Sequence, residues 1–177
     1  MNIDEYRIAT AKDVPELVSL INKSYRPSGV EAGWTHESEL IEGERINSQQ
    51  LAELLEREGS TVLLGISKAE IVACVNVNEE GGVTYIAMLT VKPSYQNLSL
   101  GKEMLQLAEE YAENQYESSE VNLFVISERR ELFDFYLRRG YEPTQVSSDY
   151  PANAGVGNPK ISGLKLVLLT KQLGRAF

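Results

Sequence analysis

The chain has 177 residues, of which 42% are hydrophobic and 24% charged, a length at which one soluble domain buries its core without disulfides or metals. Seventeen basic and 26 acidic residues give a net charge of −9, and such a surface repels polyanions, so neither nucleic acid nor an anionic membrane is expected as a partner. The single cysteine, Cys74, excludes an intrachain disulfide and a Cys-rich zinc site. The polar start and the lack of a long apolar run predict a cytoplasmic protein.

The first quarter of the chain predicts a strand followed by a helix. Tyr6, Ile8 and Thr10 alternate as in a strand, and Thr10 with Asp13 resembles a capping pair. Apolar residues then recur at helical spacing at Val14, Leu17, Val18 and Ile21. Beyond this helix we expect a lid or arm in which Thr35 and Ser48 each begin a polar helix.

The middle of the chain predicts three consecutive antiparallel strands. These are 61–66, 71–77 and 83–91, which are rich in β-branched residues and separated by short turns at 67–68 and 80–82.

After Pro93 the apolar spacing changes from two to nearly four residues, which predicts a helix that ends near Asn114. A strand at 121–126 follows, and then a second helix that ends at Gly140. Because a strand that crosses over through a helix runs parallel to its predecessor, the sheet should be mixed. Two further strands, at 141–146 and around 164–168, complete the prediction.

The junction after the strand 83–91 has the composition of a phosphate site. The strand runs into a turn that contains Ser99 and Gly101 and opens a helix at about Lys102. Amide N–H groups in a first helical turn lack intrahelical partners and converge with the positive end of the helix dipole. An ordinary strand-to-helix turn has the same local pattern, so this feature alone leaves both interpretations open.

The spacing around this turn resembles the acyl-CoA signature of the GNAT superfamily of N-acyltransferases. Leu89 and Val91 match its strand, Pro93 its turn, Gln96 the first loop position and Gly101 the last, while Ser99 stands where the family's first glycine usually lies. Serine suits that position if φ is negative and not if φ is positive. The resemblance implies an acetyl-CoA cosubstrate and no metal. The implied cofactor-binding residues are Leu89, Thr90, Val91, Gln96, Asn97, Leu98, Ser99, Leu100, Gly101, Lys102 and Arg129.

A second segment resembles the family's later motif, in which a helix carries an aromatic-Tyr pair and ends in Gly-Tyr. Tyr136 matches the tyrosine that many members place near the CoA sulfur, and the resemblance implies that it is the general acid. A tyrosine in such a helix is also a common core residue. Arg129 stands where the family often has Asn, and is a candidate to reach a phosphate. Arg138 and Arg139 are expected to be solvated charges at the helix end.

In GNAT proteins the strands that match 89–91 and 121–125 splay apart, and the pantetheine arm enters the gap. The N–H of Leu89 or Val91 would then hold the thioester oxygen, while Tyr136 protonates the departing thiolate. This direct transfer needs no covalent intermediate, and we expect Cys74 to be buried and inert.

Neither the general base nor the amine-binding residues are identified by the sequence. Glu128, Asp149, a water chain and the single histidine, His36, are candidate bases, although His36 also suits an exposed helix start. We expect Tyr25, Trp34 and Thr35 to bind the acceptor, with Tyr25 and Trp34 as an aromatic wall for a cation. The alternative for this pair is a hydrophobic staple.

The resemblance runs from Tyr6 to Lys171 in element order, and it predicts one α+β, three-layer domain, 1–177, with a mixed, mostly antiparallel sheet of about seven strands flanked by helices. The leading hypothesis is transfer of an acetyl group from acetyl-CoA to a primary amine of a small molecule, and the net charge favours a cationic one. The alternatives are a noncatalytic acyl-CoA-binding regulatory module, acetylation of a protein or peptide amine, and a purely structural domain. Pairing of the final strands in a homodimer is a family-level analogy.

Overall fold

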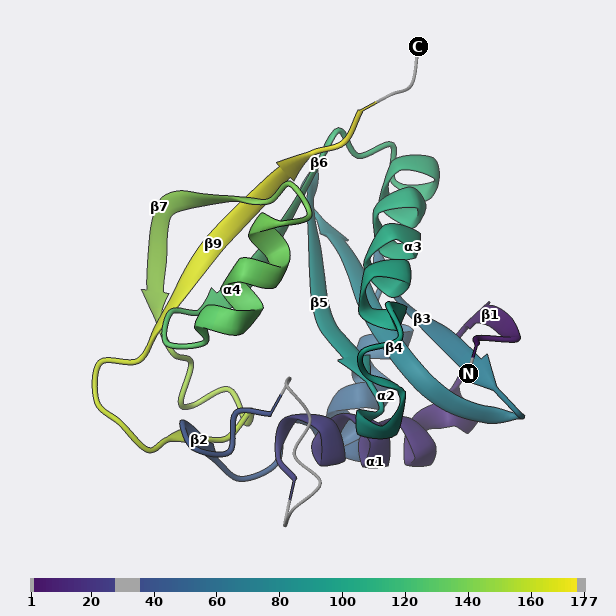
Figure 1. Ribbon diagram of the computed structural model, residues 1–177, viewed down its shortest axis with the longest axis horizontal. Helices are drawn as coiled ribbons and strands as arrows, with labels where there is room; N and C mark the ends of the chain where they lie inside the picture. Colours follow the sequence, from purple (N-terminus) through teal and green to yellow (C-terminus); the bar gives the residue numbers. More distant parts are fainter. Residues whose placement is uncertain (1, 28–35, 175–177) are drawn as a thin grey trace.

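The centre of the fold is a seven-stranded sheet in the order β1-β3-β4-β5-β6-β9-β7 (Figure 1). The computed structural model describes residues 2–27 and 36–174. The strands are β1 (Glu5–Ile8), β3 (Ser60–Ser67), β4 (Glu70–Glu80), β5 (Val83–Val91), β6 (Glu120–Ile126), β7 (Glu142–Asp149) and β9 (Lys165–Gln172). Neighbouring strands are antiparallel except for β5 and β6, which are parallel. The mixed, mostly antiparallel sheet is therefore confirmed.

The three central strands form the predicted antiparallel meander. β3 and β4 are joined by Lys68 and Ala69, one residue later than expected, and both lie in the left-handed region with φ of 51° and 63°. β4 and β5 are joined by Gly81 and Gly82, with φ of 62° and 85°. Two successive residues with positive φ match the right-handed twist of a hairpin, and glycine adopts this conformation without strain.

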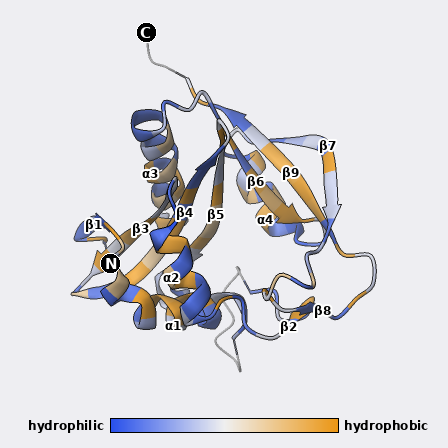
Figure 2. Cartoon of the chain, turned by 180° about the vertical axis from the view of Figure 1, so that it is seen from behind, coloured by the Kyte–Doolittle hydropathy of each residue, from blue (hydrophilic) through white to orange (hydrophobic). Residues whose placement is uncertain are grey.

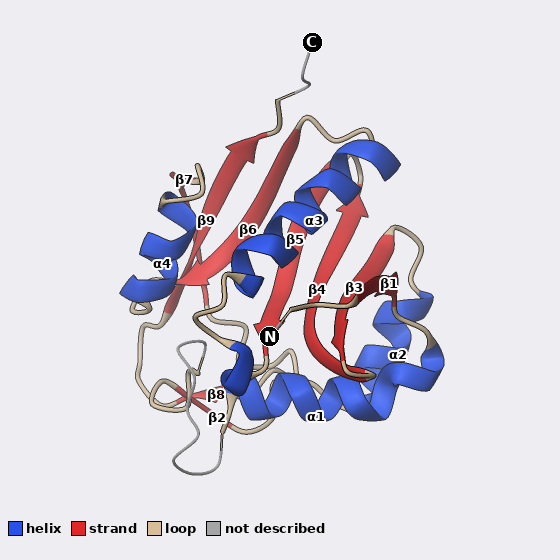
Figure 3. Ribbon diagram, turned by 45° about the vertical axis from the view of Figure 1, so that its right-hand side comes forward, coloured by secondary structure: helices blue, strands red, loops and turns tan. Residues whose placement is uncertain are grey.

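Two helices cover each face of the sheet (Figures 1 and 3). On one face lie α3 (Leu100–Gln115) and α4 (Arg130–Leu137), and on the other α1 (Val14–Tyr25) and α2 (Ser48–Glu56). Figure 2 shows apolar residues along the central strands and mixed polar and apolar residues on the helices, the pattern of helices that bury one side. The chain thus forms the predicted three layers, with one apolar core on either side of the sheet.

Both N-terminal helices begin as local sequence chemistry dictates. The Thr10 N–H donates to Oδ2 of Asp13 over 2.7 Å, and α1 follows a short 3-10 turn, η1 (Ala11–Asp13). α2 begins at Ser48, as predicted, with the side chain of Asn47 accepting from the Gln50 N–H at 2.8 Å. These caps satisfy amide donors that a helix start leaves unpaired.

A two-stranded ribbon, β2 (Ile41–Glu42) with β8 (Asn158–Pro159), was not predicted. The predicted start of a polar helix at Thr35 lies outside the described residues, and residues 36–40 form a turn rather than a helix. The ribbon joins the arm between α1 and α2 to the segment between β7 and β9. The arm is therefore anchored beside the open edge of β6.

Candidate active site

The sheet opens into two halves between β5 and β6. These strands share a single paired position, Tyr85 with Asn122, and they diverge toward their carboxyl ends (Figure 1). Among the described residues, no strand pairs with β5 on this side beyond Tyr85. The predicted splay is present, and it leaves backbone donors and acceptors of β5 without ladder partners.

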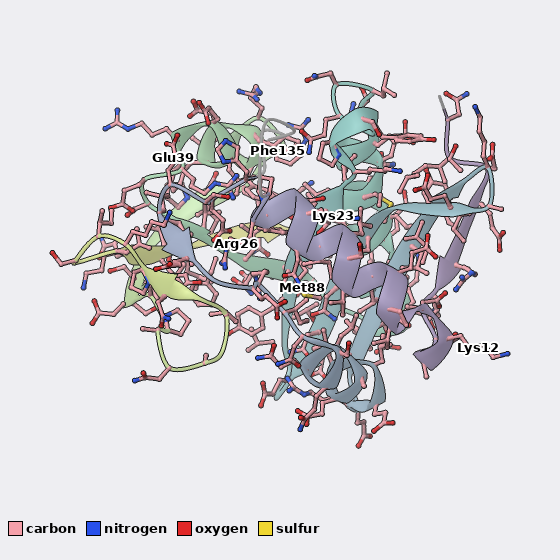
Figure 4. The ribbon with its side chains drawn as sticks, turned by 90° about the horizontal axis from the view of Figure 1, so that it is seen from below. Lys12, Lys23, Arg26, Glu39, Met88 and Phe135 are labelled. Atoms are coloured by element: carbon pink, nitrogen blue, oxygen red, sulfur yellow. The ribbon has the colours of Figure 1, made fainter. Side chains whose placement is uncertain are left out.

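A bulge in β5 lies at the mouth of this gap. Met88 has a φ of 51°, and the register against β4 shifts between the pairs Cys74 with Thr90 and Asn76 with Ala87. An extra residue of this kind bends a strand and redirects its neighbours. Met88 belongs to the core beneath α1, whereas Phe135 belongs to the core beneath α4, and Figure 4 labels both.

The carbonyl oxygens beside the gap are already occupied by side chains. Tyr25 donates its hydroxyl to the Leu89 oxygen at 2.9 Å, and Gln96 donates its side-chain amide to the Val91 oxygen at 2.9 Å. Because the N–H and C=O groups of one strand residue point to the same edge, the N–H groups of Leu89 and Val91 face the gap as well. An N–H donor is the group that stabilises developing negative charge on a thioester oxygen.

The loop after β5 leads through a 3-10 turn, η2 (Pro93–Tyr95), into α3. Asn97 and Ser99 both adopt left-handed conformations, with φ of 65° and 62°. The position that the GNAT signature usually fills with glycine therefore needs positive φ, and serine is the less suitable residue there. The amides of Leu100, Gly101 and Lys102 open the helix and have no intrahelical acceptor.

These amides border a cavity of about 360 Å³, which we call the loop cavity and which is also lined by cationic side chains. The cavity is lined by Val91, Gln96, Asn97, Ser99, Leu100, Gly101, Lys102, Glu131, Phe135, Arg138 and Arg139. Arg138 is exposed, as expected of a solvated charge, whereas Arg139 is half-buried and departs from that expectation. The guanidinium of Arg139 lies 3.5 Å from the centroid of the Phe135 ring, and its buried Nε has no hydrogen-bond partner in the described part of the chain.

A second cavity, of about 490 Å³, lies along the gap itself, and we call it the splay cavity. Its lining joins both halves of the sheet, α1, α4 and the arm: Tyr25, Glu37, Arg45, Glu80, Tyr85, Ile86, Ala87, Met88, Leu89, Leu123, Phe124, Val125, Ile126, Arg129, Leu132, Tyr136, Tyr150, Pro151, Val156 and Leu166. Leu89 of β5 lines the splay cavity, and Val91, two residues later in the same strand, lines the loop cavity.

Tyr136 projects from α4 into the splay cavity and is 7% exposed. Its ring makes edge contacts with Phe135 and Tyr141, at centroid distances of 5.2 and 5.5 Å. Burial raises the pKa of the Tyr136 hydroxyl, and Tyr25 raises it further, against an opposing effect of Arg129. The phenol therefore stays protonated at neutral pH and is available as a donor.

A buried ion network borders the splay cavity at Glu37 and Arg129. Glu37, 6% exposed, accepts from Arg26 at 3.1 Å and pairs with Arg129 at 3.7 Å. Arg26 also donates to the backbone oxygens of Gly43 and Val156, at 2.6 and 2.9 Å. The network thus ties α1 to the arm and to the segment between β7 and β9.

Several predicted site residues lie away from the cavity that the sequence suggested for them. Thr90 is fully buried, with its hydroxyl donating to the Met88 oxygen at 2.9 Å, and neither Thr90 nor Leu98 borders a cavity of the site. Leu89 and Arg129 line the splay cavity rather than the loop cavity. Of the three predicted acceptor-binding residues, Tyr25 lines the splay cavity, while Trp34 and Thr35 lie outside the described residues.

The structure does not bring the candidate bases together with Tyr136. Glu128, Asp149 and His36 do not line the splay cavity, and Asp149 pairs with Lys165 at the surface. Cys74 is fully buried, as expected, and burial raises the pKa of its thiol to about 12, which disfavours the reactive thiolate.

Sequence reasoning missed Glu37 and Arg45, which both line the splay cavity. No local motif distinguishes them, because each acquires its environment from segments far along the chain. Among the described residues, no group of three or more His, Cys, Asp or Glu side chains is placed to hold a metal ion. None of the described helices is long and apolar enough to cross a membrane.

Comparison with known proteins identifies the fold. The family model of the acetyltransferase (GNAT) domain matches residues 21–153, whereas no curated protein matches the sequence. The solved structure of PaiA N-acetyltransferase from Thermoplasma acidophilum, in complex with coenzyme A, has 17% identity and a TM-score of 0.73, covering 98% of this chain and 100% of that one.

Two further solved structures show the same architecture. The ribosomal-protein-S18-alanine N-acetyltransferase of Escherichia coli has 12% identity and a TM-score of 0.69, over 98% of this chain and 97% of that one. An N-acetyltransferase from Staphylococcus aureus Mu50 has 14% identity and a TM-score of 0.71, over 95% and 96%. With the family model matching most of its length, the chain belongs to the GNAT family of acetyltransferases.

Proposed function

We propose that the protein transfers an acetyl group from acetyl-CoA to a primary amine of a small molecule, with Tyr136 as the general acid. The observation that carries this proposal is the gap between β5 and β6, which has amide donors at one wall and the protonated Tyr136 in its lining. The coenzyme A complex of the Thermoplasma relative supports the choice of cosubstrate.

The loop cavity fits the phosphates of acetyl-CoA. The first-turn amides of α3 and the cations Lys102, Arg138 and Arg139 border it, against one carboxylate, Glu131. The buried Nε of Arg139 has no acceptor among the described residues, and an anionic oxygen would provide one. Acetyl-CoA supplies the activated acetyl thioester when it is bound there.

In the proposed reaction, the chain positions and protonates the reacting groups. The N–H of Leu89 or Val91 holds the thioester oxygen as charge develops, a contact worth roughly 3 kcal/mol. The neutral amine forms a bond to the carbonyl carbon, the carbon–sulfur bond breaks, and the Tyr136 hydroxyl gives its proton to the departing sulfur. The proton of the attacking amine leaves to a base or to solvent.

The test measures acetyl-CoA binding by calorimetry and free thiol release across a panel of amines, amino acids, polyamines and short peptides. We expect binding and thiol release with at least one small amine. Binding without release from any acceptor would replace this proposal with a noncatalytic acyl-CoA-binding module. Release with peptides alone would favour a protein or peptide acceptor, and no binding at all would favour a structural domain.

A further inference from the structure

Arg45 lines the splay cavity and has no carboxylate partner among the described residues. It lies with its guanidinium 5.8 Å from the centroid of the Tyr25 ring. Its backbone is held against α1, because Asn22 accepts from the Arg45 N–H at 2.8 Å and donates to the Ile46 oxygen at 2.8 Å. A cation on a fixed backbone beside a cavity is a ready anion-binding group.

Neither glutamate that lines the cavity forms an ion pair with Arg45. Glu37 is engaged by Arg26 and Arg129, and Glu80 is exposed at the far end of β4. The charged residues that line the cavity are two arginines, Arg45 and Arg129, and two glutamates, Glu37 and Glu80, while Arg26 binds Glu37 from outside the lining. The lining is therefore balanced in charge within a chain whose net charge is −9, so the overall charge does not describe the field that an acceptor meets.

An aromatic pair forms the apolar wall of the same cavity. Tyr85 on β5 and Phe124 on β6 stack with their centroids 6.1 Å apart and their planes 8° apart, and both line the cavity. Phe124 is 45% exposed, which is a large apolar surface to leave open to water. An acceptor with an apolar or aromatic group would cover it.

We propose that the acceptor is an amine of the α-amino-acid class, with a carboxylate that pairs with Arg45 and an apolar or aromatic side chain that packs on Tyr85 and Phe124. This inference rests on the proposed function and names its substrate class. Tyr25 connects the carboxylate site to the proposed thioester site, because its ring lies beneath Arg45 while its hydroxyl donates to the Leu89 oxygen. A carboxylate on Arg45 therefore anchors its amine near the backbone that holds the thioester. The proposed amino-acid acceptor differs from the cationic acceptor that was expected from the net charge.

The test compares L-phenylalanine with L-phenylalaninamide and L-alanine at equal concentrations of neutral amine, by thiol release at saturating acetyl-CoA. We expect kcat/KM at least tenfold higher for phenylalanine than for its amide. R45Q should lower kcat/KM for phenylalanine at least tenfold, mainly through KM, and leave the amide little changed, while R45K retains part of the preference. F124A should reduce the preference for phenylalanine over alanine.

R57Q is the matched control, because Arg57 is an exposed arginine outside the splay cavity. This variant should leave the ratios of kcat/KM between phenylalanine and phenylalaninamide, and between phenylalanine and alanine, unchanged. Acetyl-CoA affinity and melting temperature of R45Q confirm that it folds. Equal rates for the acid and the amide, or an unchanged KM in R45Q, would overturn the amino-acid proposal and leave the acetyltransferase intact. Thiol release from no amine would overturn both.

Discussion

The hydroxyl of Tyr25 donates a 2.9 Å hydrogen bond to the carbonyl oxygen of Leu89, joining the last residue of α1 to β5 just after the bulge. Burial raises the pKa of Tyr25 to about 12, with Arg45 acting in the opposite direction, so the hydroxyl remains a donor. Because β6 has already diverged from β5 at this position, the bond holds a backbone segment that has no strand on that side.

Tyr25→Phe should lower kcat about tenfold and reduce the free energy of unfolding by about 1 kcal/mol, since the Leu89 oxygen loses its donor. Steady-state kinetics and urea denaturation measure the two effects. Tyr116→Phe is the control, because the Tyr116 hydroxyl contacts Thr61 at 3.1 Å, away from the splay cavity. It should affect stability alone. An unaltered kcat in Tyr25→Phe would exclude a positioning role.

Tyr136→Phe should lower turnover by roughly 10²-fold or more while the dissociation constant of acetyl-CoA changes little, as expected for loss of a general acid. Because burial raises the pKa of this hydroxyl, the wild-type rate should show no alkaline loss attributable to Tyr136 below about pH 10. Tyr141→Phe, which removes a hydroxyl bound to Glu109, serves as the control with retained turnover. Equal turnover in wild type and Tyr136→Phe would remove Tyr136 from the mechanism.

Gly101→Asp should weaken acetyl-CoA binding at least tenfold, because it puts a carboxylate beside the first-turn amides that line the loop cavity. Isothermal titration gives the dissociation constant directly. Gly101→Ala separates the charge from the added bulk and should weaken binding less than Asp does. If the Gly101→Asp variant binds acetyl-CoA as tightly as the wild type, the phosphates lie elsewhere.

Ser99→Gly should raise the free energy of unfolding by about 0.5 to 1 kcal/mol, because glycine adopts the positive φ of 62° without strain. Thermal and urea denaturation measure this gain. Ser94→Gly is matched to it, since Ser94 lies in the 3-10 turn η2, where glycine only increases the flexibility of the unfolded chain. A stabilising Ser94→Gly or a destabilising Ser99→Gly would contradict the strain at Ser99.

Ionisation of Asp13 makes the free energy of unfolding depend on pH in the acidic range. Arg7 binds both carboxylate oxygens at 2.8 Å and lowers the pKa of Asp13 to about 2. The unfolded chain therefore takes up a proton at a higher pH than the folded one. The stabilisation, about 1 to 2 kcal/mol, is complete above about pH 5 and is lost as the pH falls through the folded pKa. Denaturation of wild type and Asp13→Asn should differ at pH 6 and converge near pH 2, and a constant difference would refute this linkage.

The sheet and helices were largely predictable because their signals are local. Alternation identified β3, β4 and β5, the helical spacing after Pro93 identified α3, and the crossover rule gave the parallel pairing of β5 and β6. The loop at Ser99 to Lys102 was also found, from a spacing that depends on one strand and one helix.

The ion network beside the splay cavity was not predictable, because distant segments create it. Arg26 binds Glu37 and the oxygen of Val156, residues that share no motif. The ribbon of β2 and β8 is equally nonlocal, with two residues in each strand, too few for a periodic signal. Neighbouring residues on α4 also line different cavities, Tyr136 the splay cavity and Phe135 the loop cavity.

The bulge at Met88 also decides which way the end of β5 faces. Ile86 belongs to the core under α3, Met88 to the core under α1, and Leu89 and Val91 again to the core under α3. Even positions face α3 before the bulge, and odd positions do so after it. Deleting one residue here would invert every side chain from Leu89 onward and turn the start of the loop that leads to α3 toward the wrong layer. Insertions and deletions should therefore be tolerated at the Gly81-Gly82 hairpin but not in the last third of this strand.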